Sequence, residues 1–170
     1  MIQKQNVALI YLSADLMAGI GFLRKLAMDL VDQVRIESAS SVYKRYLTSR
    51  REDLNSELCV VLKVSTLLTH LELGTYLDSQ QVERGQNGSP ATVRAILLSF
   101  SNQVMLTPKR PLPHPQLHSD PLTMRCASEI YGSYEHPVLG QTLNELVKSS
   151  ETPESIEFYS QGRSLLGDHA

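Results

Sequence analysis

The stretch SELCVVLKVS, residues 56–65, shows a two-residue apolar period. Successive side chains of an extended chain point to opposite faces. One face therefore carries Leu58, Val60, Leu62 and Val64, and the other carries Cys59, Val61 and Lys63. This pattern predicts a β-strand. The β-rich run VRIESASSVYKRYL, residues 34–47, precedes it across the polar segment TSRREDLN, so we expect an antiparallel pair joined by a loop.

Strands and helices alternate on both sides of this pair. The aliphatic run NVALIYLS, residues 6–13, predicts a first strand, and apolar residues at helical spacing from Leu16 to Val31 predict a helix that Asp15 would cap. A second helix is expected over residues 66–81, and a fourth strand over ATVRAILLSFS, residues 91–101. The order β-α-β-β-α-β predicts an α+β fold, a ferredoxin-like split βαβ sandwich with a central antiparallel sheet flanked by helices.

The C-terminal half is predicted to be loop and short helices. The Pro-rich segment from Pro108 to Pro121 is expected to be a loop, because proline does not fit a helix interior or a central ladder. Three short helices follow, at residues 122–130, 142–148 and 153–159, the last capped by Thr152. We expect residues 1–170 to form a single domain, in which residues 149–170 are a C-terminal extension of a short helix and a tail.

Composition excludes several classes of partner. The chain has 170 residues, 16 Lys and Arg against 18 Asp and Glu, and a net charge of -2, which gives no footprint for nucleic acid or an anionic membrane. No apolar stretch approaches the roughly 20 residues that span a bilayer. Two cysteines do not make a disulfide framework. We therefore expect a cytoplasmic protein with no nucleic-acid or membrane partner.

Two histidines lie close together in RPLPHPQLHSD, residues 110–120. As a zinc pair, His114 and His118 have helix-like spacing in a segment where prolines prevent a helix, and no thiolate or third histidine is near in the sequence. We therefore predict no metal site there.

The second half of the chain resembles hydroxymethyldihydropterin pyrophosphokinase, an enzyme family of the folate pathway. The resemblance rests on residues 89–146, and includes Thr107-Pro108, Pro113-His114-Pro115, Leu117-His118 and the run HPVLG at residues 136–140. Upstream, LIYLSADL, SSVYKRYL and EDLNSELCVV are similar to further motifs of the family. The likeness spans nearly the whole chain and implies the same fold.

The resemblance implies a reaction that this chain is poorly equipped to perform. The family transfers a pyrophosphoryl group from ATP to the hydroxymethyl group of a pterin, with two Mg²⁺ ions held by an Asp-x-Asp pair on one strand face. Those positions are Arg94 and Ile96 here. Neither side chain offers an oxygen to a hard cation. A family arginine that faces phosphate corresponds to Asp120, and a family threonine corresponds to Arg45.

Other family site residues are replaced as well. The aromatic rings that sandwich the pterin correspond to Asp53 and Leu122, so only Asn55 and His114 match the family's site residues. Loss of one charge-stabilising donor typically costs about a hundred- to a thousandfold in rate. Because several such groups are missing together, we expect no catalytic residues, no metal and no bound cofactor, although the family uses Mg²⁺ and ATP.

Two functions remain in view from the sequence. The first is a pseudoenzyme that binds a different small molecule in the old cleft, or a partner protein. Its ligand-binding candidates are Asn55, His114, Arg45 and Arg94, which would give the cleft a positive lining suited to a small anion. The alternative is an active pyrophosphokinase of folate biosynthesis whose site is differently aligned. Asn55 and His114 have a second interpretation, in which each only hydrogen-bonds its own loop.

Overall fold

The computed structural model describes residues 4–88, 91–151 and 155–167. Within them an antiparallel sheet of six strands runs in the order β5-β1-β4-β3-β6, and β2 pairs with β4 beside β3. The strands are β1 (Asn6–Asp15), β2 (Arg35–Ala39), β3 (Val42–Tyr46), β4 (Ser56–Thr66), β5 (Val93–Phe100) and β6 (Ile156–Ser160). The predicted α+β class with a central antiparallel sheet is confirmed.

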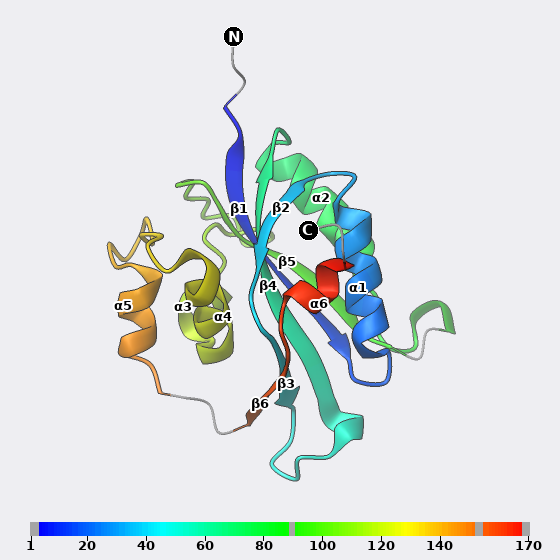
Figure 1. The fold of residues 1–170 in the computed structure, drawn as a ribbon. Helices are drawn as coiled ribbons and strands as arrows, with labels where there is room; N and C mark the ends of the chain where they lie inside the picture. The colour runs from blue at the N-terminus through cyan, green and yellow to red at the C-terminus, as the bar shows by residue number, and fades with distance from the viewer. Residues whose placement is uncertain (1–3, 89–90, 152–154, 168–170) are drawn as a thin grey trace.

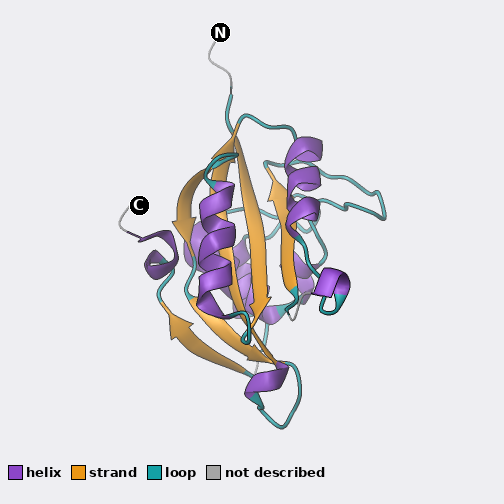
Figure 2. Ribbon diagram, turned by 90° about the vertical axis from the view of Figure 1, so that its right-hand side faces the viewer, coloured by secondary structure: helices purple, strands orange, loops and turns teal. Residues whose placement is uncertain are grey.

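Helices cover both faces of the sheet, as Figures 1 and 2 show from two directions. One layer consists of α1 (Gly19–Leu30), α2 (His70–Gln80) and the short α6 (Arg163–Leu166). The other consists of α3 (Gln116–Ser119), α4 (Pro121–Tyr131) and α5 (Leu143–Lys148). Each layer closes a separate hydrophobic core against its face of the sheet. None of the described helices is long and apolar enough for a membrane span.

The position of β4 in the sheet explains its alternating sequence. It pairs with β1 from Glu57 to Thr66 on one side and with β2 and β3 on the other. The predicted face of even-numbered residues packs into the core under α1 and α2, and the odd-numbered Cys59 and Val61 pack into the core under α4. A strand with apolar residues on both faces needs a helical layer on each side. The period read from the sequence is therefore confirmed.

Some predicted boundaries are wrong. The first helix begins at Gly19, while Asp15 is the last residue of β1 and forms an ion pair with Arg84 instead of capping the helix. The segment expected to be loop up to Pro121 contains α3, which starts directly after Pro115. The run 34–47 is two strands rather than one, and between them Ser40 accepts the Val61 N–H with its hydroxyl and donates its own N–H to the Val61 carbonyl.

The helix expected over residues 153–159 is also wrong where the structure describes it. Residues 156–160 form β6, which pairs with the outer edge of β3, and the predicted cap and proline lie outside the described residues. The unpaired edge of β3 supplies hydrogen bonds that a local helix signal does not include. Beyond β6 the chain turns at Gly162, and the fully buried Leu165 anchors α6 in the core beside α1.

Candidate functional site

A cavity of about 470 Å³ opens on the sheet face that carries α3. Its lining residues come from four strands and the Pro-rich segment, and they are Tyr11, Arg45, Leu47, Glu57, Arg94, His114, Pro115, Gln116, Ser119 and Asp120. Three of the four ligand-binding candidates, Arg45, Arg94 and His114, thus lie around one cavity. Asn55 does not line it, and is exposed in the short 3₁₀ helix η1 (Asp53–Asn55) that precedes β4.

Strand alternation directs the side chains into this cavity. On β5, Ile96 packs into the core of the α4 side and Arg94 lines the cavity, so the two project from the same face, as the period predicts. On β1, Tyr11 lies on this face between Ile10 and Leu12, which belong to the other core. The Pro-rich segment is held above β5 by the His114 N–H, which donates to the Leu98 carbonyl at 2.7 Å.

Arg45 is the centre of the site's charge network. Its Nη1 lies 2.9 Å from Asp120 Oδ1, and its Nε lies 3.2 Å from Glu57 Oε1, close enough for an ion pair but without hydrogen-bond geometry. The three side chains are 21%, 20% and 10% exposed, respectively. Burial lowers the pKa of the guanidinium, but the surrounding groups outweigh it and the pKa lies above its usual value. Arg45 is therefore a fixed cation held between two carboxylates.

Two buried groups complete this network on the sheet side. Arg45 Nη2 donates to the Tyr11 hydroxyl at 2.9 Å, and the hydroxyl lies 3.1 Å from Cys59 Sγ and 3.5 Å from Glu57 Oε1. Burial raises the pKa of both Tyr11 and Cys59 well above their usual values. Both groups are therefore neutral near pH 7. Because the thiolate is the reactive form of cysteine, Cys59 is not placed to act as a nucleophile.

Asp120 links the network to the helical layer. Its side chain caps α4 by accepting the Thr123 N–H at 3.3 Å and the Thr123 hydroxyl at 2.6 Å. Gln116 Nε2 in turn donates to the Thr123 hydroxyl at 2.9 Å. Asp120 and Arg45 are two of the charged residues that the sequence comparison predicts to replace family site residues, and the structure pairs them with each other. Their opposite signs are the signal in the sequence that could have predicted this contact.

His114 is partly engaged by its own loop. Its Nδ1 accepts the Gln116 N–H at 3.1 Å, which leaves the ring proton on Nε2. Burial, followed by the neighbouring His118, lowers the pKa of His114. The neutral imidazole is therefore favoured near pH 7, and the ring adds a hydrogen-bond donor rather than a charge. The loop interpretation of His114 has an observed hydrogen bond, and a ligand role through Nε2 stays a prediction.

His118 lies outside the cavity and contacts a different histidine. Its exposed ring stacks edge-on against buried His136, with 5.1 Å between ring centroids. His136 Nδ1 accepts the N–H groups of Val138 and Leu139, so this nitrogen is not free to bind a metal. Within the described ranges no group of three or more His, Cys, Asp and Glu side chains could hold a metal ion.

The cavity is less positive than the sequence predicts. Arg45 and Arg94 are balanced by Glu57 and Asp120, and His114 favours its neutral form. Arg94 is exposed and has no ion-pair partner among the residues that the structure describes. It is thus the cationic group of the cavity that remains open to a ligand.

The two residues that the sequence comparison aligned with the family's pterin-stacking rings provide no stacking surface. Asp53 is exposed and forms an ion pair with Lys44, and Leu122 is fully buried in the core under α4. The ring of Tyr11 lines the cavity but is only 2% exposed. A flat heterocycle would therefore find little aromatic area here.

Comparison with known proteins relates the fold, but not the sequence, to a described enzyme. No protein-family model and no curated protein matches the chain. Its fold is an HPPK-like fold, shared with solved structures of HPPK-DHPS, an enzyme of the folate pathway.

Two of these structures come from Plasmodium falciparum. One is wild-type HPPK-DHPS with pterin and p-hydroxybenzoate, at a TM-score of 0.67 and 11% identity, covering 92% of this chain and 47% of that one. The other is a triple mutant with SDX-DHP, at a TM-score of 0.68 and 11% identity, covering 92% and 45%. The chain thus spans a little under half the length of these proteins.

Proposed function

We propose that this protein is a pyrophosphokinase-fold pseudoenzyme that has lost ATP:hydroxymethyldihydropterin pyrophosphoryl transfer and binds a small molecule or a protein. The proposal includes a ferredoxin-like split βαβ core, which the strand order β5-β1-β4-β2 supports. It also includes a cytoplasmic location, supported by two cysteines that are both buried and free.

The observation that carries this proposal is the ion cluster of Arg45, Glu57 and Asp120. In this cluster one cation forms ion pairs with two carboxylates, at a place where the family resemblance requires groups that hold substrate. At the two positions where the family has metal-binding aspartates, the structure has exposed Arg94 and partly buried Ile96. A triphosphate with divalent ions would meet Asp120 in place of a positive partner.

The alternative is an active pyrophosphokinase of folate biosynthesis. Calorimetric titration with Mg²⁺ and ATP separates the two, because the pseudoenzyme should show no magnesium-dependent nucleotide binding. Restoring aspartate with Arg94→Asp and Ile96→Asp should not recover transfer, since Asp120 stays in place. Micromolar binding of Mg²⁺-ATP, or transfer to a hydroxymethylpterin, would contradict the proposal.

For the small-molecule function, the cavity favours a small anion. Arg94 supplies a guanidinium that forms no ion pair with a described residue, and His114 and the exposed Ser119 line the same cavity. Guanidinium groups bind carboxylates and phosphates through paired hydrogen bonds.

A thermal-shift panel of inorganic phosphate, small carboxylates and pterin tests this ligand class. A ligand at a hundred times its dissociation constant stabilises by about 2.7 kcal/mol, which raises the melting temperature by several degrees. Arg94→Gln should remove an anion-induced shift, while Lys109→Gln, at another exposed cation outside the cavity, should preserve it. A strong pterin shift would contradict the anion assignment, and no shift with any compound would favour a protein partner.

A further inference from the structure

A second, larger hollow lies away from the candidate site, at the free edge of β2. It has a volume of about 1310 Å³ and is formed by the α1–β2 turn, the first half of β2 and the end of β4. Among the described strands, β2 pairs with β4 alone. Its other edge is open at the front of the sheet in Figure 1, between the two helical layers. Such an edge presents unpaired backbone N–H and C=O groups to a further strand.

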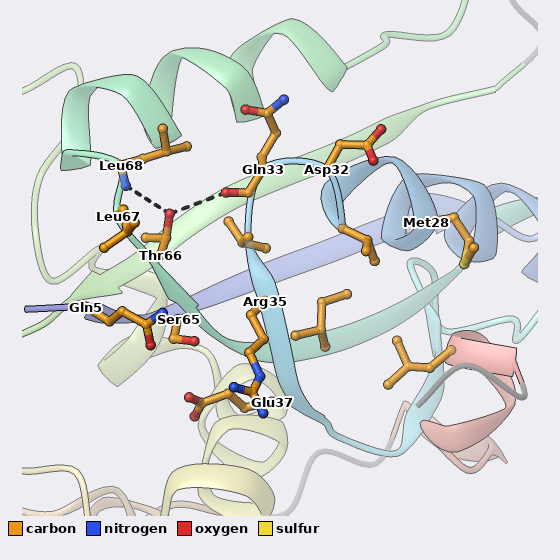
Figure 3. Close-up of a pocket in the computed structure, with 14 residues that line it drawn as sticks. Gln5, Met28, Asp32, Gln33, Arg35, Glu37, Ser65, Thr66, Leu67 and Leu68 are labelled. Atoms are coloured by element: carbon orange, nitrogen blue, oxygen red, sulfur yellow. Dashed lines mark hydrogen bonds between the residues drawn. The ribbon is translucent and has the colours of Figure 1, made fainter. Parts of the chain in front are cut away.

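The residues Arg35, Ile36 and Glu37 give this edge a particular charge pattern. Arg35 lies opposite Ser65 on β4, and Glu37 lies 3.7 Å from Lys63, so both project from the α4 face of the sheet. Figure 3 shows the two side chains on the same side of β2. Both are exposed, and Arg35 has no ion-pair partner in the part of the chain that the structure describes.

We propose that this edge binds a second copy of the chain, with the two β2 strands antiparallel and related by a twofold axis at Ile36. In that register Arg35 of each copy lies directly opposite Glu37 of the other, and the two Ile36 residues face each other. Directly opposite side chains of an antiparallel pair share a face and lie about 4.5–5.5 Å apart at Cβ. The sequence Arg-Ile-Glu is therefore complementary to itself, as an interface with twofold symmetry requires.

The apolar side of the edge supports the same occupant. Met28 and Val31 at the end of α1, and Leu67 after β4, line the hollow and are 45%, 54% and 59% exposed. Partly buried Ile36 belongs to the core on that face. Twofold pairing would therefore bring the exposed apolar side chains of both copies beside the central isoleucines. The contact would bury part of this apolar surface, which favours association.

The geometry also limits the strength of the contact. The β2–β4 register shifts between Ile36 and Ser38, so Glu37 has no Cα partner on β4, and a bulge of this kind ends the regular edge there. Regular backbone pairing is therefore confined to Arg35 and Ile36, and Glu37 contributes through its side chain. We expect a reversible dimer that forms as the protein concentration rises.

Charge-reversal variants test the proposed register of the two β2 strands. Sedimentation velocity of the full chain over a concentration series should show wild type moving towards the dimer. Arg35→Glu and Glu37→Arg place like charges opposite each other, and each should weaken self-association by about tenfold to thirtyfold. An equimolar mixture of the two variants restores opposite charges and should recover dimerisation. Lys109→Glu, a charge reversal in the Pro-rich segment, should behave as wild type.

Cross-linking gives an independent readout of the same geometry. In the proposed register Ile36→Cys places two thiols opposite each other, within the Cα separation of about 4.4–6.8 Å that a disulfide needs. Mild oxidation should give a covalent dimer. Arg35→Cys is the control, because its two thiols are offset along the strands and should cross-link poorly. Cys59 and Cys126 are buried and do not compete.

The outcomes decide the proposal. A wild-type chain that stays monomeric at all concentrations would overturn it, as would self-association that both charge variants leave unchanged. Loss of association in each variant without recovery in the mixture would overturn the antiparallel register. Recovery in the mixture, together with selective cross-linking at position 36, would support it.

Discussion

Replacing Arg45 with methionine should destabilise the protein strongly, because it leaves two carboxylates without their cation. Removing one partner of a buried ion pair typically costs about 3–5 kcal/mol. The three side chains of this cluster keep 10–21% of their surface exposed, so water screens part of that penalty. We expect the free energy of unfolding to fall by about 2–4 kcal/mol at pH 7.

Urea unfolding followed by circular dichroism measures this loss directly. For a domain of this size, each kcal/mol corresponds to roughly 2–4 °C in melting temperature. The matched control is Arg94→Met, at an exposed arginine of the same cavity that forms no ion pair with a described residue. It should change stability by no more than about 0.5 kcal/mol.

A triple variant separates charge from packing. Adding Glu57→Gln and Asp120→Asn to Arg45→Met removes the uncompensated charges, and asparagine can still cap α4. Much of the lost stability should therefore return. If the free energy of unfolding of Arg45→Met lies within about 0.5 kcal/mol of the wild-type value, the ion pairs of Arg45 do not stabilise the protein as we describe. The same conclusion follows if the triple variant is no more stable than the single variant.

Three further results are expected. Burial lowers the pKa of His136, so the unfolded chain binds the proton more readily and stability should fall as the pH drops below about 6.5. In urea midpoints measured across that range, His136→Asn should weaken this pH dependence, and part of it should remain because the pKa of His114 is lowered as well. Gly162→Ala should cost about 1–3 kcal/mol, because the new methyl group meets backbone carbonyls of the β2–β3 junction, whereas Gly21→Ala on α1 has open space and should be neutral or stabilising in the same assay. Burial raises the pKa of Cys126 to about 12 and also raises the pKa of Cys59. Ellman's reagent should therefore react with both thiols in denaturant and with neither in the native protein. Rapid labelling of the native protein would contradict the burial of the two thiols.

Much of the fold could be predicted from the sequence because its signals are local and periodic. The alternation in residues 56–65 identified β4 and assigned its two faces correctly. The same period placed Arg94 and Ile96 on one face of β5. The prediction for residues 153–159 failed because β6 depends on a hydrogen-bonding partner, β3, that lies far away in the sequence.

The candidate site also has features that could be read from the sequence and features that only the structure revealed. From the sequence alone, the residue types in the segments that resemble the family's metal-binding and phosphate-facing motifs could be read, because that question does not depend on the fold. Which of those residues touch could not be read, since Arg45, Glu57 and Asp120 come from β3, β4 and the start of α4. Charge pairing depends on distance and burial, and both are set by the packing of the sheet against its helices. Only the tertiary structure showed that Arg45 is held between two carboxylates while Arg94 stays open to the cavity.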